Sequence, residues 1–186
     1  MIRDDFFNFA LHNPPGATNN RYAEEVLAKQ MPPEVVQEVK AIEAKGQYDS
    51  PRYMELLIPH FYAHHLYRLP ELPDALNRSF GKINKDLYVL MQGPSEFGAS
   101  GRLEQWDRKA DLPKLAMPTL VIGATHDTMD PAHMKWVSTR VQHGSFLLCP
   151  NGSHCAMWDD QAHYFPGLLR WLKAVDAGKQ SVSLQP

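Results

Sequence analysis

Hydrophobic residues in the first half of the chain recur at the spacing of α-helices. A helix is predicted to begin at Pro33 and to end near Gly46, because proline suits a first helical turn and glycine often follows the last one. One face of this segment carries four apolar residues, Val35, Val36, Val39 and Ile42.

A second helical stripe begins after Ser50, and Pro59 is expected to kink this helix because proline cannot donate a backbone hydrogen bond. Its apolar positions are Tyr53, Leu56, Leu57 and Phe61. Shorter helices are predicted to begin at Asp74 and at Asn84. The residues from about 20 to 95 therefore indicate a small all-helical unit.

The second half of the chain changes to a pattern typical of β-strands. Short apolar runs at 118–123 and 145–149 predict two strands, and Asp130 and Pro131 open a helix between them. A long amphipathic helix is predicted over 159–175. This strand, helix, strand, helix order predicts parallel strands joined by a right-handed crossover. The tail from Asp176 lacks an apolar pattern and is predicted to be disordered.

The composition is that of a globular protein and argues against several classes of protein. The chain has 186 residues, of which 44% are hydrophobic and 22% charged. A net charge of −2 without a basic cluster argues against nucleic-acid binding, and no apolar run approaches the ~20 residues that span a membrane. An acidic start and only two cysteines, Cys149 and Cys155, predict a reducing, cytoplasmic location.

Each predicted strand leads into a residue suited to proton transfer. Asp127 follows the first strand and His154 follows the second, so both are expected at the same edge of a parallel sheet. A carboxylate that orients an imidazole forms the last two members of a Ser-His-Asp triad, in the order that α/β-hydrolases use. The alternatives are that Asp127 caps the following helix, for which Asp130 is better placed, and that His154 is a surface histidine.

The nucleophile of such a triad is missing from the sequence. No Gly-x-Ser-x-Gly elbow occurs. Ser95 lies in half an elbow, Gly93-Pro94-Ser95-Glu96-Phe97, and Ser100 is no better supported. The sequence therefore predicts two of the three triad members.

Two further groups of polar residues lie in the helical unit. His60 and His64 have a spacing that can hold zinc, but no third ligand accompanies them, so a structural or pocket-lining role is favoured and no metal or other cofactor is predicted. Glu96 occupies a turn beside aromatic residues. Its carboxylate could receive a substrate ammonium group or remain a solvated turn acid.

Taken together, these motifs resemble the C-terminal part of a proline iminopeptidase (prolyl aminopeptidase), a serine peptidase of the α/β-hydrolase fold. The resemblance runs from about Tyr22 to Val175. The matching segments include Met91-Gln92-Gly93-Pro94-Ser95-Glu96-Phe97, Asp127-Thr128-Met129-Asp130-Pro131 and Asn151-Gly152-Ser153-His154. Of these, the Gly-Pro-x-Glu-Phe and Gly-Ser-His parts are fairly specific, whereas the Asp and His alone would suit any α/β-hydrolase.

The resemblance implies an α/β fold: the C-terminal part of an α/β-hydrolase, with short parallel strands and crossover helices, preceded by an all-helical cap. It divides the chain into an unplaced segment 1–20, a helical cap 21–105, a C-terminal α/β-hydrolase segment 106–175 and the tail 176–186.

The resemblance also implies site roles. Asp127 looks like the triad acid, His154 like the triad base, and Glu96 like the cap carboxylate that binds the free amino group of the substrate. Some relatives carry a second glutamate directly after the triad aspartate. Thr128 stands there in this chain, and Asp130 is the acid available to replace it.

The expected substrate is a peptide with a free N-terminal proline, and no nucleic acid or membrane partner is expected. A complete enzyme of this kind has a further N-terminal section that carries the nucleophile, so an N-terminal half-chain is a possible partner and this chain alone is expected to be inactive. The alternative is a non-catalytic, degenerate relative that acts as a binding or interaction module. The free sheet edge predicts a tendency to aggregate or oligomerise.

Overall fold

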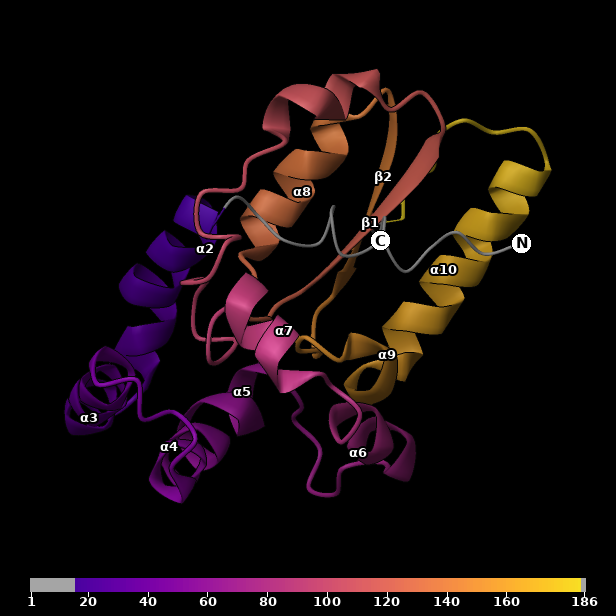
Figure 1. Ribbon diagram of the computed structural model, residues 1–186. Helices are drawn as coiled ribbons and strands as arrows, with labels where there is room; N and C mark the ends of the chain where they lie inside the picture. Colours follow the sequence, from indigo (N-terminus) through magenta and orange to yellow (C-terminus); the bar gives the residue numbers. More distant parts are fainter. Residues whose placement is uncertain (1–15, 185–186) are drawn as a thin grey trace.

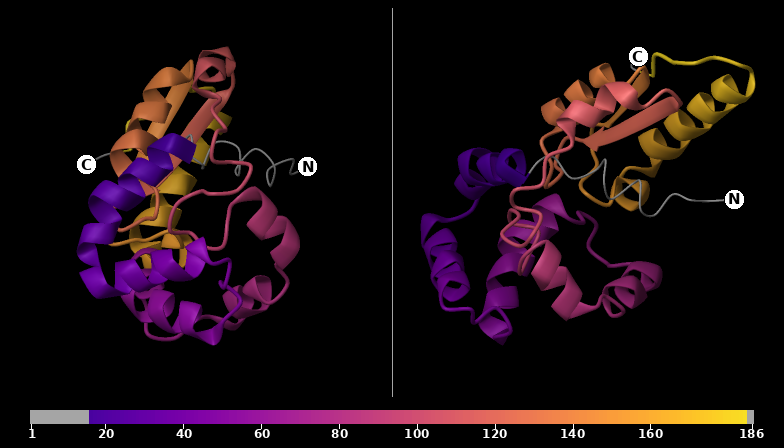
Figure 2. Two further views of the ribbon diagram at one scale, coloured as in Figure 1. Left: turned by 60° about the vertical axis from the view of Figure 1, so that its left-hand side comes forward. Right: turned by 45° about the horizontal axis from the view of Figure 1, so that its top comes forward.

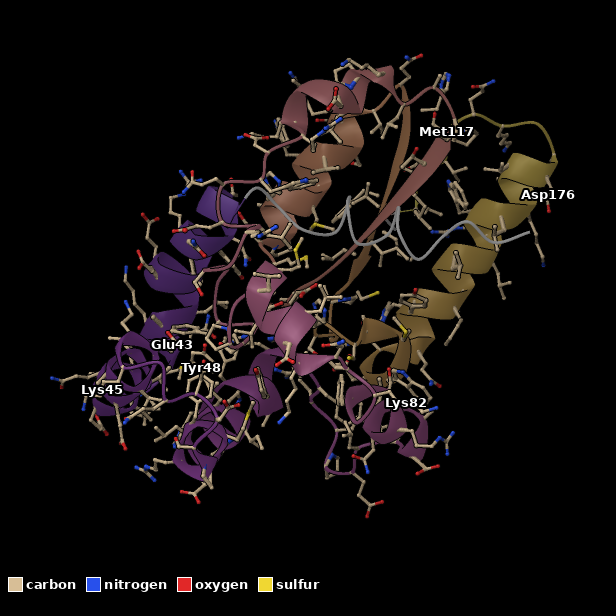
Figure 3. The ribbon with its side chains drawn as sticks, in the orientation of Figure 1. Glu43, Lys45, Tyr48, Lys82, Met117 and Asp176 are labelled. Atoms are coloured by element: carbon tan, nitrogen blue, oxygen red, sulfur yellow. The ribbon has the colours of Figure 1, made fainter. Side chains whose placement is uncertain are left out.

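The computed structural model describes residues 16–184, and most of the unplaced segment 1–20 lies outside this range. A helical cap is followed by a smaller α/β part, and the cap lies at the end of the sheet where both strands finish (Figure 1). Figure 2 shows the two parts joined through this end of the strands. In Figure 3, Met117 and Asp176 mark the opposite end of the molecule from Glu43 and Lys82, which lie in the cap.

The helical cap consists of short helices in a curved layer. In chain order these are α2 (Gly16–Tyr22), the π-helix η1 (Ala23–Leu27), the 3₁₀ helix η2 (Ala28–Gln30), α3 (Pro33–Ala44), α4 (Pro51–Leu57), the π-helix η3 (Ile58–Tyr62), α5 (Ala63–His65), α6 (Asp74–Phe80) and α7 (Lys85–Met91).

The core of the cap matches the predicted helical stripes. Tyr53, Leu57 and Phe61 are fully buried, and Val35 and Val39 of α3 pack into the same cluster. The kink predicted at Pro59 takes the form of the π-helical turn η3, since the missing N–H of proline interrupts the regular α-helical ladder.

The α/β part has two parallel strands between helices. The 3₁₀ helix η4 (Lys109–Lys114) leads into β1 (Pro118–Ala124), which pairs with β2 (His143–Cys149) in the register Pro118 to His143. The helix α8 (Pro131–Arg140) connects the strands and lies on one side of them, while α10 (Gln161–Asp176) lies on the other side (Figure 1). The predicted parallel strands and crossover helix are therefore present.

The long C-terminal helix differs from the prediction in where it begins. A short helix, α9 (Ala156–Asp159), precedes α10, and the two are separated at Asp160. The buried carboxylate of Asp160 accepts a hydrogen bond from the backbone N–H of Asn151 and so binds the loop after β2. Phe165 and Leu169 of the predicted apolar stripe are 43% and 53% exposed, so α10 packs only part of its apolar surface.

The last described residues have no regular secondary structure but contact β2 and α10. The N–H of Val182 donates to Oγ of Ser145, and a guanidinium N–H of Arg170 donates to the carbonyl of Leu184. Leu184 is buried. A side-chain acceptor on β2, Ser145, and a side-chain donor on α10, Arg170, therefore bind the main chain of this segment.

Among residues 16–184 the sheet has only these two strands. Over the same range, no helix has both the length and the apolar character that a membrane crossing requires.

Candidate active site

The two triad-like residues meet where the strands end. Nδ1 of His154 lies 2.9 Å from Oδ1 of Asp127, although 27 residues separate them in the chain. Asp127 belongs to the loop 125–130 after β1, called here the Asp127 loop, and His154 belongs to the loop 150–155 after β2, called the His154 loop. The sequence-based expectation that these side chains lie together agrees with this geometry.

Backbone hydrogen bonds hold the two loops against each other. The N–H of Thr125 donates to the carbonyl of Cys149 at 3.1 Å, and the N–H of His126 donates to the carbonyl of Gly152 at 3.0 Å. These bonds continue the pairing of β1 and β2 beyond the strands. The main-chain bonds therefore hold the segments that carry Asp127 and His154 side by side.

The side chain of Asp127 is shielded from solvent, and its carboxylate accepts several hydrogen bonds. The side chain is buried, and Oδ1 accepts from the backbone N–H of Met129 and from the hydroxyl of Thr128, each at 3.2 Å. The hydroxyl oxygen of Thr128 also lies 3.3 Å from Nδ1 of His154. Thr128 thus contacts both members of the pair.

His154 is held in its charged form by its neighbours. Burial lowers the pKa of its imidazole, but the charge of Asp127 and its hydrogen bond outweigh this effect, and the pKa is raised from 6.5 to about 9. The charges of Glu96 and Asp159 raise it further. The imidazole side chain remains 28% exposed, so a solvent-borne or protein-borne group can reach it.

Glu96 lies in the cap turn that follows α7. The hydroxyl of Tyr88 donates a hydrogen bond to Oε1 of Glu96. The turn is flanked by Gly93 and Gly98, whose φ angles of 110° and 96° are strained for residues with a side chain. The negative charge of Glu96 contributes to raising the pKa of His154, so the cap carboxylate and the imidazole interact electrostatically.

The residue that caps the helix after β1 is Asp130 and not Asp127. Oδ1 of Asp130 accepts a hydrogen bond from the N–H of Ala132 at 2.8 Å and caps α8, with Pro131 at the first helical position. Asp130 is thus placed as the sequence predicts.

The other polar groups that the sequence singles out do not join the pair. Ser95 is buried and its hydroxyl oxygen accepts from the N–H of Phe97, while Ser100 is exposed. His64 is exposed, and residues 16–184 contain no group of three or more His, Cys, Asp or Glu side chains placed to hold a metal ion.

Three residues near the pair escaped the sequence reasoning. Tyr88 holds Glu96, and His65 and Asp159 bind the main chain of the His154 loop. No helical spacing links Tyr88 to Glu96, because α7 ends at Met91 and Glu96 lies in the turn beyond it. The contacts of His65 pass through main-chain atoms, for which the sequence holds no signal.

Curated proteins that are similar to this chain in sequence share one name, proline iminopeptidase. The chain is 54% identical over 159 residues to a proline iminopeptidase of Flavobacterium johnsoniae, 57% over 158 residues to one of Elizabethkingia meningoseptica and 46% over 163 residues to one of Chitinophaga pinensis. These alignments cover 86%, 84% and 87% of this chain and 54%, 53% and 54% of the relatives. The chain therefore spans about half the length of the curated relatives it matches. No family model matches it.

Solved structures agree on the fold. The crystal structure of VinJ superposes with a TM-score of 0.77 at 25% identity and covers 84% of this chain and 53% of that one. The proline iminopeptidase of Mycobacterium smegmatis superposes with a TM-score of 0.74 at 24% identity and covers 88% and 55%. Sequence and fold together show that the chain is similar to the C-terminal portion of a proline iminopeptidase and has part of the α/β-hydrolase fold.

Proposed function

We propose that this chain supplies the acid, the base and the amine-binding carboxylate of a serine hydrolase that releases N-terminal proline from peptides. The 2.9 Å contact between His154 and Asp127 at the carboxyl ends of two parallel strands carries the proposal. In this scheme His154 takes the proton of a serine nucleophile, and Asp127 orients the imidazole and stabilises its charged form. The names of the relatives support the choice of substrate.

Glu96 is proposed to bind the free amino group of the substrate. Tyr88 fixes one oxygen of its carboxylate, and an ammonium group can bind to the other through a charge-assisted hydrogen bond. A bound cation would offset the charge by which Glu96 raises the pKa of His154. The pKa of the imidazole would then fall, which favours the neutral form that a general base requires.

The serine nucleophile is proposed to come from an N-terminal half that pairs with this chain. Among residues 16–184, one edge of β1 has no strand partner, and the α6–α7 region exposes the apolar residues Phe80, Ile83, Leu87 and Leu90; both features support a large complementary surface. Without that half, this chain alone is proposed to lack peptidase activity and to aggregate or oligomerise.

A non-catalytic role as a binding module is the second candidate. The absence of a Gly-x-Ser-x-Gly elbow from the sequence favours it. Under this proposal the cap still binds an amine through Glu96, but no covalent step follows.

A reconstitution experiment separates the two functions. The chain would be mixed with a separately produced N-terminal half of a related proline iminopeptidase, and turnover of a proline arylamide and labelling by a serine-directed covalent probe would be measured. Activity and labelling in the mixture, lost with His154→Ala, support the split enzyme. A mixture that forms a complex but neither turns over substrate nor labels supports the binding module. Turnover by the chain alone would overturn the proposed need for a second half.

A cytoplasmic location is proposed from the cysteines. Cys149 and Cys155 are both free and buried, which is usual in a reducing compartment.

A further inference from the structure

His65 occupies an unusual place between the cap and the two catalytic loops. It is the last residue of α5 and is only 3% exposed. Its ring packs beside Phe61 of the cap core, with the ring centroids 5.3 Å apart. It is therefore fixed to the most buried part of the cap.

The side chain of His65 binds the main chain next to Asp127. Its Nδ1 lies 3.0 Å from the carbonyl oxygen of His126, and a carbonyl can only accept. Nδ1 must therefore carry the proton in this contact. The bond anchors the Asp127 loop one residue before the carboxylate.

The main chain of the same residue binds His154. The carbonyl of His65 accepts the N–H of His154 at 2.9 Å, and the carbonyl of the next residue, Leu66, accepts the N–H of Cys155 at 3.0 Å. One residue of the cap thus holds both loops, one through its ring and the other through its carbonyl.

We propose that His65 is a positioning residue for the Asp127–His154 pair, through which the cap sets the distance between the acid and the base. This inference rests on the proposed function in assigning catalytic roles to the pair. If the bond to His126 is lost, the ring of His65 no longer holds the Asp127 loop, and only the His154 side of the 2.9 Å contact stays bonded to His65, through its carbonyl. The role is distinct from that of His64, whose exposed side chain has the same chemistry one residue earlier.

Two substitutions isolate the hydrogen bond from the packing. The side-chain amide of His65→Asn places an N–H near the position of Nδ1, whereas that of His65→Gln places it near Nε2. The pKa of the His154 imidazole, followed by NMR from about pH 6 to about pH 10, reports the contact with Asp127 without any need for a nucleophile. His64→Gln serves as the matched control.

The expected result is that His65→Asn and His64→Gln keep the raised pKa of His154, and that His65→Gln lowers it by roughly one unit. In a reconstituted enzyme, His65→Gln should lower kcat roughly tenfold with little change in KM, as expected for a misplaced acid–base pair. If His65→Asn and His65→Gln both leave the pKa unchanged, or lower it equally, the positioning role is overturned.

A measurement on the unmodified chain keeps the proposal testable if the variants do not fold. The ¹⁵N shifts of the His65 ring at neutral pH must show the proton on Nδ1, and a proton on Nε2 alone would overturn it. Failure of the proposed peptidase function appears separately, as absence of turnover in the reconstituted wild-type mixture.

Discussion

The Nδ1 atom of His154 lies 2.9 Å from Oδ1 of Asp127, and this contact couples the two loops that follow β1 and β2. Because the carboxylate is buried, its charge is poorly screened by water and acts strongly on the imidazole. The pair therefore affects stability as well as chemistry, and its effect depends on pH.

The first prediction concerns this pH dependence. The pKa of His154 is raised from 6.5 to about 9 in the folded chain, so protonation of His154 stabilises the fold fully below about pH 6.5 and this contribution is lost as the pH rises through about 9. The free energy of unfolding should fall by on the order of 3 kcal/mol across this window. Urea unfolding at several pH values measures it.

Asp127→Asn should remove this dependence. The amide keeps the size of the side chain but not its charge, so the pKa of His154 should return toward its ordinary value and the unfolding free energy should become nearly flat between pH 7 and pH 9. Asp130→Asn is the control, because an asparagine still caps α8 and the residue is not among the charges that raise this pKa. Equal pH dependence in the wild type and Asp127→Asn would contradict the assignment.

Glu96→Gln should lower the pKa of His154 by less than Asp127→Asn does. The amide oxygen still accepts the hydrogen bond of Tyr88, so the turn is preserved while the charge is removed. Asp127 acts on His154 through both charge and a hydrogen bond, whereas Glu96 acts through charge alone. An NMR titration of His154 measures the difference.

The chain offers a matched control for Glu96. Glu43 is a second cap carboxylate that accepts a hydrogen bond from a tyrosine hydroxyl, that of Tyr53, but it is not among the main charges that raise the pKa of His154. Glu43→Gln should therefore leave the pKa of His154 unchanged. An equal shift in both variants would show that the effect is not specific to the Glu96 turn.

A further prediction tests whether Asp130 only caps α8 or belongs to the candidate site. Asp130→Ala should lower the free energy of unfolding by about 1 kcal/mol, since the N–H of Ala132 loses its acceptor at the start of α8. The same variant should leave the raised pKa of His154 in place. Thermal unfolding and the His154 titration test both parts, and a large fall of that pKa would assign Asp130 to the site.

Periodic burial made the cap predictable from the sequence. Val35 and Val39 lie on one face of α3, and Phe61 completes the stripe of the next helix, as the spacing of apolar residues requires. The positions of Asp127 and His154 could equally be predicted, because the carboxyl ends of parallel strands lie at the same edge of a sheet.

Long-range contacts with no sequence pattern were not predictable. His65 reaches His126 across 61 residues through a carbonyl group that every residue possesses. Val182 likewise binds a hydroxyl of β2 through its main-chain N–H, a group that no sequence pattern marks. The break at Asp160 depends likewise on a carboxylate that binds the N–H of Asn151, nine residues away.

The last prediction concerns the start of β2, which requires a residue without a side chain at Gly144. A Cβ atom there would lie 1.8 Å from the carbonyl oxygen of Ser138 and 2.7 Å from a methyl group of Val141. The first of these atoms belongs to the backbone of α8 and cannot move without shifting the helix. Gly144→Ala should therefore lower the free energy of unfolding by about 3 kcal/mol.

Gly81→Ala is the matched control for this substitution, since the nearest atom to its added Cβ is 3.5 Å away and its φ angle of −66° suits alanine. Its unfolding free energy should stay within about 0.5 kcal/mol of the wild type. Equilibrium unfolding in urea compares the two variants directly. If Gly144→Ala is as stable as Gly81→Ala, then α8 can move away from β2 at little cost. The packing of α8 against β2 would then be looser than the short distance to Ser138 implies. It would give less support to the strand pairing that places Asp127 beside His154.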